Sequence, residues 1–331
     1  MGKVTISHIA DALGITPSTV SRALTGSPRV KAETRLKVEQ VAEKMGYERN
    51  EMASNLRRGT AQTVGIIVPR INRQFFGSVI SGAESVLNAA GYTVIVSQTH
   101  ESLENEISAL RTMRRNQVAA VLLSHNIEST DGAYVREILG ENIHLVQFDR
   151  VYDDLPGAKI VNDNYAGAFE ATLHLAAQGY RRIGTIAGHM SCSHYRERLR
   201  GWRDALEKAG LEYDGRLVFE DSILRETGHD SALKAIAEGC DALYCAGDFS
   251  ALGAIEAARE KGLDVPEDLG VVGTANENFT SLMSPALSTL EMSPKEIGAA
   301  AAEAFLNGSE DTRTIPMQLI QRQSSIKTKK S

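Results

Sequence analysis

Apolar side chains recur at intervals of three and four near the N-terminus, which is the spacing of helices that bury one face. The pattern predicts helices over residues 6–13, 17–24 and about 31–45. Thr16 is a good N-cap, and Pro17 suits the first turn of the second helix. Three short helices with a tight turn between the first two indicate a helix-turn-helix, whose second helix can enter a DNA major groove.

The polar positions of the second predicted helix suit contact with DNA. The side chains opposite its apolar stripe are Pro17, Ser18, Ser21 and Arg22. Arg22 can donate two hydrogen bonds to a guanine edge, and the hydroxyls of Thr19 and Ser21 can bond phosphate oxygens. A small three-helix bundle with a polar surface shows the same periodicity, so this pattern alone leaves both interpretations open.

From residue 63 onward, short β-rich runs alternate with helical stretches. The runs are Val64–Val68, Thr93–Ser97, Val118–Leu123, Leu145–Phe148, Ile160–Val161, Ile183–Ala187, Leu243–Cys245 and Val271–Val272. Such alternation is typical of an α/β fold in which helices cover both faces of parallel sheets. The segment 82–91 returns in similar form at 201–210, which favours two similar α/β subdomains, although a chance match in helix-rich sequence is the alternative.

Polar and aromatic residues follow many of the predicted strands. Ligands of open parallel sheets bind beyond the carboxyl ends of the strands. The positions at these ends are 70–76, 97–100, 124–126, 149–150, 189–198, 248 and 274–276. Aromatic rings there can stack on a sugar or a base, and charged groups can bond hydroxyls. We therefore expect a small polar ligand in a cleft between two lobes.

Composition and charge narrow the class of protein. The chain has 331 residues, 42% hydrophobic and 24% charged, which is typical of a folded protein with two or three domains. No apolar run approaches about 18 residues and the N-terminus lacks a long apolar stretch, so we expect a cytoplasmic protein with no membrane partner. Residues 1–60 carry ten Lys and Arg against six Asp and Glu, whereas the remainder carries 26 against 36. A polyanionic partner is therefore expected at the first sixty residues.

Motifs for other chemistries are missing from the sequence. Cys192, Cys240 and Cys245 have no CxxC spacing and are expected to be buried or idle thiols. His189, Cys192 and His194 lie close together without a fixed zinc spacing, so no metal is expected. The dinucleotide, P-loop and esterase motifs do not occur, so we expect no cofactor and no enzyme activity.

The segment from Thr16 to Leu24 resembles the recognition helix of LacI-type (LacI/GalR family) transcription regulators. The similarity runs along nearly the whole chain, through Gly46-Tyr47, Asn72-Arg73-Gln74-Phe75-Phe76, Gly179-Tyr180-Arg181-Arg182-Ile183, Arg198-Leu199-Arg200-Gly201-Trp202 and Pro285-Ala286-Leu287-Ser288-Thr289. It implies a helix-turn-helix domain over residues 1–47, a hinge helix or linker over 48–60, and an effector-binding and dimerisation domain over 61–331. This last domain would resemble periplasmic binding proteins, with α/β subdomains of roughly 61–160 plus 290–320, and 161–289.

The resemblance implies which residues contact DNA. They are Thr5, Pro17, Ser18, Thr19, Ser21, Arg22, Asn50, Ala53, Leu56 and Arg57. Leu56 occupies the position of a leucine that the family inserts between base pairs in the minor groove. A helix over residues 50–58 is too short to be stable by itself, so we expect it to order only when paired on bent DNA. Arg49 stands where a proline is usual, which leaves the start of this helix open, and an ordinary flexible linker is the alternative.

The resemblance also implies the lining of an effector pocket. The residues are Phe75, Phe76, Ser124, Asp149, Arg198, Asp248 and Asn276. Two positions depart from the family: Ala275 lacks the carboxylate that usually bonds a sugar hydroxyl, and Gly247 replaces a common asparagine. A pocket with one acidic group fewer favours an effector that has its own carboxylate, which Arg198 can bind. We therefore expect a small polar effector that is a sugar or a sugar acid.

Together these features predict a homodimeric repressor of carbohydrate or related catabolic genes. Its two recognition helices would read the half-sites of a pseudopalindromic, double-stranded operator. The segment 327–330 shows no leucine heptads, which favours a dimer over a tetramer built by the C-terminal tail. A stand-alone sugar-binding protein or a sugar-processing enzyme is the alternative. Induction and corepression by the effector remain equally open.

Overall fold

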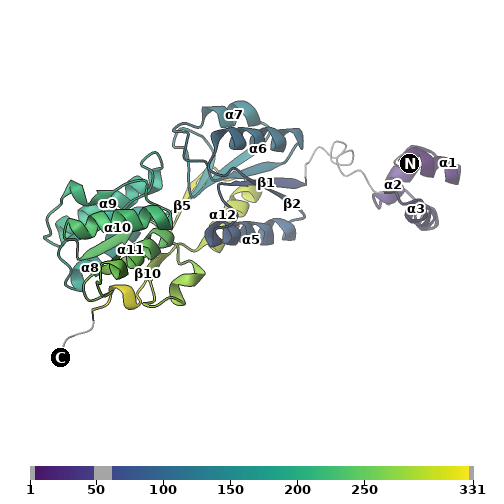
Figure 1. Ribbon diagram of the computed structural model, residues 1–331. Coiled ribbons are helices and arrows are strands. Elements are labelled where there is room, and N and C mark those ends of the chain that lie inside the picture. The colour runs from purple at the N-terminus through teal and green to yellow at the C-terminus, as the bar shows by residue number, and fades with distance from the viewer. Residues whose placement is uncertain (1–3, 48–61, 328–331) are drawn as a thin grey trace. The chain divides into compact units, whose positions relative to one another are not determined.

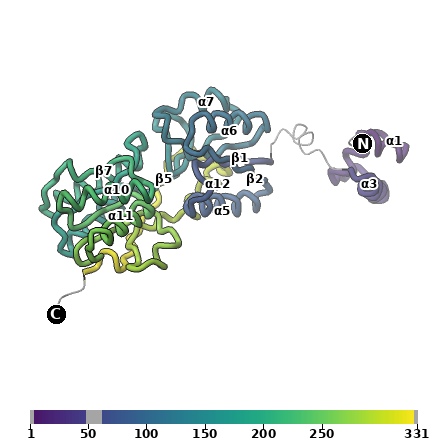
Figure 2. The backbone as a smooth tube through the Cα atoms, in the orientation of Figure 1, coloured from purple at the N-terminus to yellow at the C-terminus, as the bar shows by residue number. Residues whose placement is uncertain are grey.

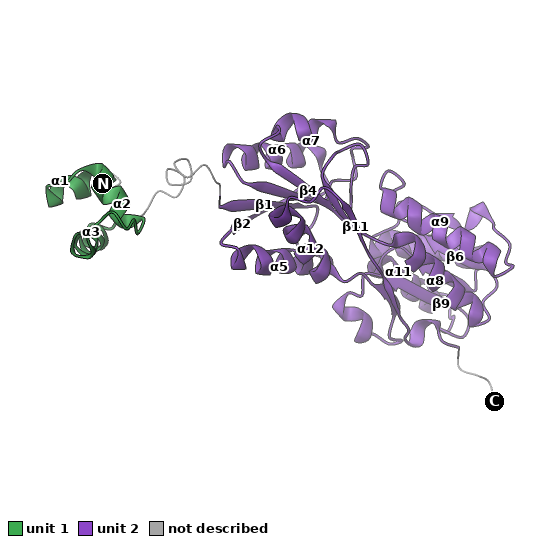
Figure 3. Cartoon of the chain, turned by 180° about the vertical axis from the view of Figure 1, so that it is seen from behind, with its two compact units in different colours: residues 1–61 green, residues 62–331 purple. Residues whose placement is uncertain are grey.

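The computed structural model describes residues 4–47 and 62–327, and the chain divides into two compact units, residues 1–61 and 62–331 (Figure 3). The first unit holds the helices α1 (Ile6–Leu13), α2 (Pro17–Leu24) and α3 (Ala32–Lys44). The three helices predicted from the apolar spacing are confirmed. Gly14 ends α1 in the left-handed conformation, with a φ of 65°. Thr16 caps α2 by accepting a hydrogen bond from the Thr19 amide at 3.3 Å.

A small apolar core holds these three helices together. Ile9, Val20 and Val38 each contribute a fully buried side chain, one from each helix. Arg35 on α3 donates to the carbonyl groups of Gly26 and Ser27 at 3.2 and 3.0 Å, which fixes the turn after α2. The core uses one face of α2, so its polar face is left at the surface of the unit.

The second unit is built on two six-stranded sheets, as the alternating pattern predicts. The first sheet has the order β11-β5-β4-β3-β1-β2 and is parallel throughout. Its strands are β1 (Thr63–Val68), β2 (Thr93–Gln98), β3 (Ala120–Leu123), β4 (His144–Phe148), β5 (Ala158–Asn162) and β11 (Thr312–Ile315). One face is covered by α5 (Gln74–Ala89) and α12 (Pro294–Asn307), and the other by α6 (Leu103–Arg115) and α7 (Ala133–Leu139) (Figure 1).

The second sheet has the order β12-β10-β9-β8-β6-β7 and is parallel except for the pair of β10 with β12. Its strands are β6 (Ile183–Ile186), β7 (Val218–Phe219), β8 (Ala242–Cys245), β9 (Gly270–Thr274), β10 (Ser288–Glu291) and β12 (Gln318–Ile320). Of its helices, α8 (Asn164–Ala177) packs against α9 (Ser193–Lys208), and α10 (Arg225–Ala237) packs against α11 (Asp248–Glu260). The described part of the unit also has three short 3₁₀ turns: Gly215–Leu217, Asn278–Ser281 and Gln323–Ser325.

Alternating side chains of β8 show how this sheet is buried on both faces. Tyr244 lies in the same apolar core as Trp202 of α9. The preceding residue, Leu243, lies in a different core with Ala254 of α11. Successive side chains of a strand point to opposite faces, so a strand covered on both sides is apolar along its whole length.

The chain passes between the two sheets three times, from β5 to α8, from β10 to α12 and from β11 to β12 (Figure 2). The range 290–320 expected for the first subdomain therefore divides, because α12 and β11 lie with the first sheet and β12 pairs with β10 in the second. The sequence pattern does not predict β7, β10, β11 or β12, which are two to four residues long and too short to show a period. None of the described helices has the length and apolar character needed to span a membrane.

Candidate functional site

A cavity in the second unit lies beyond the carboxyl ends of strands from both sheets, where open parallel sheets bind ligands. Its charged lining residues are Arg70, Arg73, Glu101, Asp149, Arg150, Arg198 and Glu277. Its aromatic lining residues are Phe75, Phe76, Tyr195 and Phe249. The predicted cleft for a small polar ligand thus corresponds to a cavity with rings and charges of both signs.

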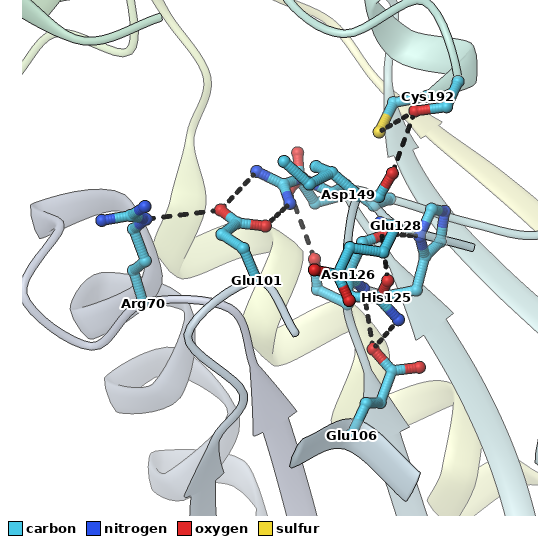
Figure 4. A network of polar contacts seen from close by, with 12 residues as sticks. Arg70, Glu101, Glu106, His125, Asn126, Glu128, Asp149 and Cys192 are labelled. Atoms are coloured by element: carbon cyan, nitrogen blue, oxygen red, sulfur yellow. Dashed lines mark hydrogen bonds and ion pairs between the residues drawn. The ribbon is translucent and has the colours of Figure 1, made fainter. Parts of the chain in front are cut away.

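Glu101 joins two of these arginines on one side of the cavity. Arg70 Nε lies 3.4 Å from Glu101 Oε1, and Arg150 Nη2 lies 3.2 Å from the same oxygen (Figure 4). The side chains of Arg150 and Glu101 are only 6% and 10% exposed. Burial by itself lowers the pKa of Arg150, but attraction to Glu101 outweighs it and the net shift is upward. Two guanidinium groups thus share one carboxylate, which leaves this side of the cavity positively charged.

Arg198 on α9 is buried and is held by neutral groups. Its Nε donates to Asn164 Oδ1 and its Nη1 to the Ala246 carbonyl, both at 2.8 Å. Its Nη2 contacts the sulfur of Met292 at 3.7 Å. Among the described residues, no carboxylate lies within ion-pair distance of this guanidinium. These bonds fix its position and leave two of its five N–H groups for a ligand.

Asp149 follows β4 and provides a carboxylate next to Arg198. Its backbone is left-handed, with a φ of 58°, which is uncommon for a residue other than glycine. Burial raises the pKa of Asp149, while the charges of Arg150 and Arg198 oppose the shift. Ser124 Oγ donates to Asp149 Oδ2 at 3.4 Å. Ser124 is fully buried and does not line the cavity, and it contacts the site through Asp149.

Arg73 and Phe249 both line the cavity and contact each other there. Arg73 precedes α5 in the first sheet's lobe, and its guanidinium carbon lies 3.7 Å from the centre of the Phe249 ring on α11. Burial and the charge of Arg70 lower the pKa of Arg73. Glu277 lies nearby, and burial raises the pKa of its carboxyl. A hydrogen bond from the backbone amide of Gln74 and the charge of Arg73 lower this pKa. A cation and an anion are therefore close here without an ion pair between them.

Asp248 is placed differently from its predicted role in the pocket. It does not line the cavity, and it is 1% exposed. Its Oδ1 accepts a hydrogen bond from Thr289 Oγ1 at 2.6 Å, and its Oδ2 accepts one from the Glu277 amide at 2.8 Å. Burial raises the pKa of Asp248 to about 7. Its two oxygens are used inside the protein, so it supports the segment that carries Glu277.

Asn276 also lies outside this cavity. Its Nδ2 donates to Glu291 Oε2 at 2.7 Å, and its Oδ1 accepts from Arg322 Nη2 at 2.9 Å. It lines a neighbouring hollow that shares Phe75 and Ala275 with the main cavity. Of the seven residues predicted for the pocket, four line the main cavity: Phe75, Phe76, Asp149 and Arg198. Ser124 and Asp248 are buried away from its surface, and Asn276 lines the neighbouring hollow.

Sequence reasoning missed Glu101, Phe249 and Glu277, which all line the cavity. Each lies one residue beyond a range expected at a strand end. His100 and Asn276, the residues before the two glutamates, have left-handed backbones with φ of 55° and 50°. His and Asn adopt this conformation more readily than most residues, so their presence is a signal that the chain can turn here.

A second set of buried polar groups supports the cavity from behind. Glu106 on α6 is fully buried, and its Oε2 accepts from the amide and the Nδ2 of Asn126 at 2.7 and 2.9 Å (Figure 4). The Tyr134 hydroxyl donates to Glu106 Oε1 at 2.5 Å. Asn126 Oδ1 in turn accepts from the amide of Glu128 at 2.8 Å. These bonds fix the segment after β3, next to Ser124.

The predicted DNA contacts in the first unit lie mainly at its surface. Thr5, Pro17, Ser18 and Arg22 are exposed, and Thr19 and Ser21 are half-buried. The Thr16 hydroxyl lies 2.9 Å from the hydroxyls of both Ser18 and Thr19. Arg22 has no side-chain partner within the described part of the chain, so its N–H groups are available to DNA. The other predicted contacts, Asn50, Ala53, Leu56 and Arg57, lie outside the described residues.

The cysteines offer no reactive group. Cys192, Cys240 and Cys245 are free and buried, as the sequence predicts. Burial raises the pKa of each thiol, and that of Cys240 reaches about 12. They therefore remain protonated and unreactive near neutral pH.

Comparison with known proteins assigns the chain to a family. Residues 5–50 match the model of the bacterial regulatory proteins of the lacI family, and residues 172–325 match a periplasmic binding protein-like domain. The transcriptional repressor CytR of Escherichia coli K12 is 30% identical over 308 residues, which cover 92% of this chain and 89% of CytR. The chain belongs to the lacI family of bacterial regulatory proteins.

Other similar proteins agree with this assignment. The ribose operon repressor of Haemophilus influenzae is 28% identical to this lacI-family member over 321 residues, covering 95% of the chain and 96% of the relative. A lac repressor dimer bound to operator and the anti-inducer ONPF has the same fold, with a TM-score of 0.87, 24% identity, and coverage of 98% and 100%. The lacI-family chain is a DNA-binding transcription regulator, and these relatives are regulators rather than enzymes.

Proposed function

We propose that this lacI-family regulator is a homodimeric, cytoplasmic repressor of carbohydrate or related catabolic genes. A small polar effector bound in the cavity changes the affinity of the protein for its operator. The observation that carries the proposal is the presence, in one chain, of an exposed polar face on α2 and a cavity with rings and charged groups beyond strand ends of two sheets.

The proposed DNA contacts begin with the surface of α2. Arg22 is exposed and has donors for a guanine edge, while Thr19 and Ser21 supply hydroxyls for phosphate. Thr5, Pro17 and Ser18 complete the contacts of this unit. A two-fold dimer matches a two-fold operator, so the double-stranded site is pseudopalindromic. Asn50, Ala53, Leu56 and Arg57 provide the contacts of the hinge segment.

The proposed effector is a sugar or a sugar acid. Phe75 and Phe76 provide apolar faces, Arg198 provides free N–H donors, and Asp149 provides an acceptor. The relative from Haemophilus influenzae is named as a repressor of a ribose operon, which supports a carbohydrate as the signal. Ser124, Asp248 and Asn276 act on this site indirectly, through the residues they hold.

The proposed control works through the relation between the two lobes. The effector touches segments from both sheets, and three crossings of the chain connect them. A ligand that binds one arrangement of the lobes better than another shifts the protein toward that arrangement. The hinge segment over residues 48–60 links this change to the DNA-binding helices.

A gel-shift experiment tests the proposal. The full chain is compared with a chain of residues 62–331, using operator DNA selected from a random pool and a nonspecific duplex of the same length. The full chain should bind the selected DNA specifically, and the shortened chain should lose this binding while still binding effector in calorimetry. Specific operator binding by residues 62–331 would show that DNA recognition lies elsewhere and would contradict the proposal.

A further inference from the structure

The charges around the cavity favour a ligand that carries a negative charge. Four arginines and three carboxylates line it, the arginines being Arg70, Arg73, Arg150 and Arg198. A buried guanidinium without a counter-charge is costly, and an anionic ligand supplies that charge together with hydrogen bonds.

Arg73 is the arginine best placed to meet this anion. The Phe249 ring covers one face of its guanidinium at 3.7 Å, which orients the plane of the group. The N–H donors point along that plane and not into the ring, so stacking leaves them available. Arg73 has no hydrogen-bond acceptor among the described residues, whereas Arg70 and Arg150 both bond Glu101.

Glu277 lies beside Arg73 and faces the same cavity. The two groups influence each other's pKa, but they form no ion pair within 4.0 Å in the described part of the chain. The Glu277 amide is bonded to Asp248 at 2.8 Å, which holds this residue at the cavity wall. A donor group and an acceptor group therefore both line the cavity, and the Glu277 carboxylate also has a hydrogen bond from the backbone amide of Gln74.

We propose that Arg73 and Glu277 together recognise an α-hydroxy carboxylate on the effector, the grouping found at one end of an aldonic acid. Arg73 binds the carboxylate, and Glu277 accepts a hydrogen bond from the neighbouring hydroxyl. This inference rests on the proposed function, because it names the effector class of the same cavity. Ala275 lacks the carboxylate that the family resemblance implies there, and Glu277, two residues later, places a carboxylate on the cavity wall.

His194 adds a neutral polar ring to the cavity lining. It lines the cavity and is 5% exposed, and its Nδ1 is buried without a hydrogen-bond partner among the described residues. Burial and the charges of Arg198 and Arg150 lower the pKa of His194, so its ring is neutral near pH 7. A neutral imidazole can accept a bond from a hydroxyl or donate one to it.

Calorimetric titration of the full chain tests the proposal. The probes are gluconate and galactonate, the 2-deoxy form of each acid, the matching uronates, and the neutral sugars glucose and galactose. The wild type should bind at least one aldonate about tenfold more tightly than its neutral sugar and its 2-deoxy form, since one hydrogen bond to a charged group has about this effect.

Two variants test whether Arg73 and Glu277 cause the tighter binding of the aldonate. Arg73→Gln should weaken aldonate binding by about tenfold or more and change neutral-sugar binding by less than about threefold. Glu277→Gln should weaken binding of the aldonate and not of its 2-deoxy form. Asn72→Ala, an exposed change in the same loop, is the matched control and should leave all affinities unchanged. Arg73→Lys keeps the charge and provides a second variant if Arg73→Gln unfolds at a lower temperature.

Three results would overturn the inference. The wild type could bind acids and neutral sugars with equal affinity, or bind no acid at all. Arg73→Gln could lose affinity for acids and for neutral sugars by the same factor. Gel-shift assays on the same preparations separate this failure from that of the proposed function. Specific operator binding without any aldonate effect leaves the regulator proposal intact and removes only the assignment of Arg73 and Glu277.

Discussion

At the scale of single residues, Asp248 shows how a buried carboxyl can serve a site without entering it. Both of its oxygens accept hydrogen bonds, one from Thr289 and one from the Glu277 amide. A side-chain carbon on Gly273 would overlap Asp248 Oδ1, so the backbone packs directly on this carboxyl group. Such tight enclosure removes water from the carboxylate and favours its protonated form.

We predict that ionisation of Asp248 makes the stability of the protein depend on pH. Burial raises the pKa of the folded group to about 7, with Glu277 adding to the shift and Thr289, the Glu277 amide and Arg322 opposing it. An unfolded carboxyl titrates near pH 4, so this contribution to stability is fully present below pH 4 and is lost as pH rises through 7. Asp248→Asn cannot ionise. Its free energy of unfolding, relative to that of the wild type, should therefore rise by up to about 4 kcal/mol as the pH increases from about 4 to about 7.

Urea unfolding of the wild type and Asp248→Asn at several pH values between 4.5 and 8 checks this prediction. The substitution also places an NH₂ group near the Glu277 amide, which adds a cost that does not depend on pH. The informative quantity is therefore the change with pH in the difference between the two unfolding free energies. A constant difference across the range would show that Asp248 is not protonated in the folded protein at neutral pH.

Arg22 gives a second residue-scale prediction, on base preference. Its side chain is exposed on α2 and has no partner within the described residues. Arg22→Ala should cost about 1–3 kcal/mol on the preferred operator and relax the preference at one base pair of each half-site. Nonspecific DNA should be bound nearly as before. Selection from random DNA followed by sequencing measures this, and an unchanged recovered site would remove Arg22 from base recognition.

At the scale of elements, α5 and α12 show how glycine brings two helices together. A side-chain carbon on Gly298 of α12 would overlap the Val79 carbonyl oxygen of α5, and one on Gly82 of α5 would overlap the Lys295 carbonyl oxygen. The backbones therefore touch where the two helices cross. This contact holds the middle of α5 against α12, and Arg73 is the N-cap residue of the same helix.

We predict opposite effects for two glycine substitutions in this pair. Gly298→Ala should destabilise the second unit by about 1–3 kcal/mol, because the obstructing atom is backbone and the helices must move apart. Gly77→Ala is the control, since it lies in α5 with open space around it and should stabilise the helix by about 0.5–1 kcal/mol. Thermal or urea unfolding measures both, and a neutral Gly298→Ala would mean that the two backbones do not pack closely.

At the scale of the whole molecule, the second unit can couple ligand and DNA because its cavity is shared by two sheets. Arg73 and Phe76 come from the lobe of the first sheet, and Arg198 and Phe249 come from the lobe of the second. Gln74 Oε1 also accepts from the Asn278 amide, at 2.6 Å, across the same boundary. A ligand in the cavity therefore contacts both lobes and can favour one arrangement over another.

We predict that effector and operator change each other's affinity by the same factor. Coupling of this kind is about 1–3 kcal/mol, or roughly 5- to 150-fold. Fluorescence anisotropy should give the operator affinity with and without saturating effector, and calorimetry should give the effector affinity with and without operator. Arg198→Lys, which loses the fork of donors bonded to Asn164 and Ala246, should reduce effector affinity and leave operator affinity without effector unchanged. At equilibrium the two factors must agree, so a factor of one in both measurements would show that the effector and operator sites are not coupled.

The local pattern of the sequence determined most of the elements. Helices α1 and α2 follow from apolar spacing with Gly14 and Thr16 at their ends, and eight of the strands follow from short β-rich runs. These features depend on neighbours within a few positions, so they are visible in the sequence. The four short strands β7, β10, β11 and β12 depend on partners far away in the chain, and their own residues are too few to show a period.

The composition of the cavity was decided by the tertiary structure. The sequence could place Arg198 and Asp149 at strand ends, but Arg73 meets Phe249 only because two lobes fold against each other, and these residues are far apart in the chain. The backbone turn at Asn276 directs the chain so that Glu277 lines the cavity while Asp248 bonds behind it. The identity of a side chain sets which bonds it can make, whereas its neighbours in space determine which of them remain for a ligand.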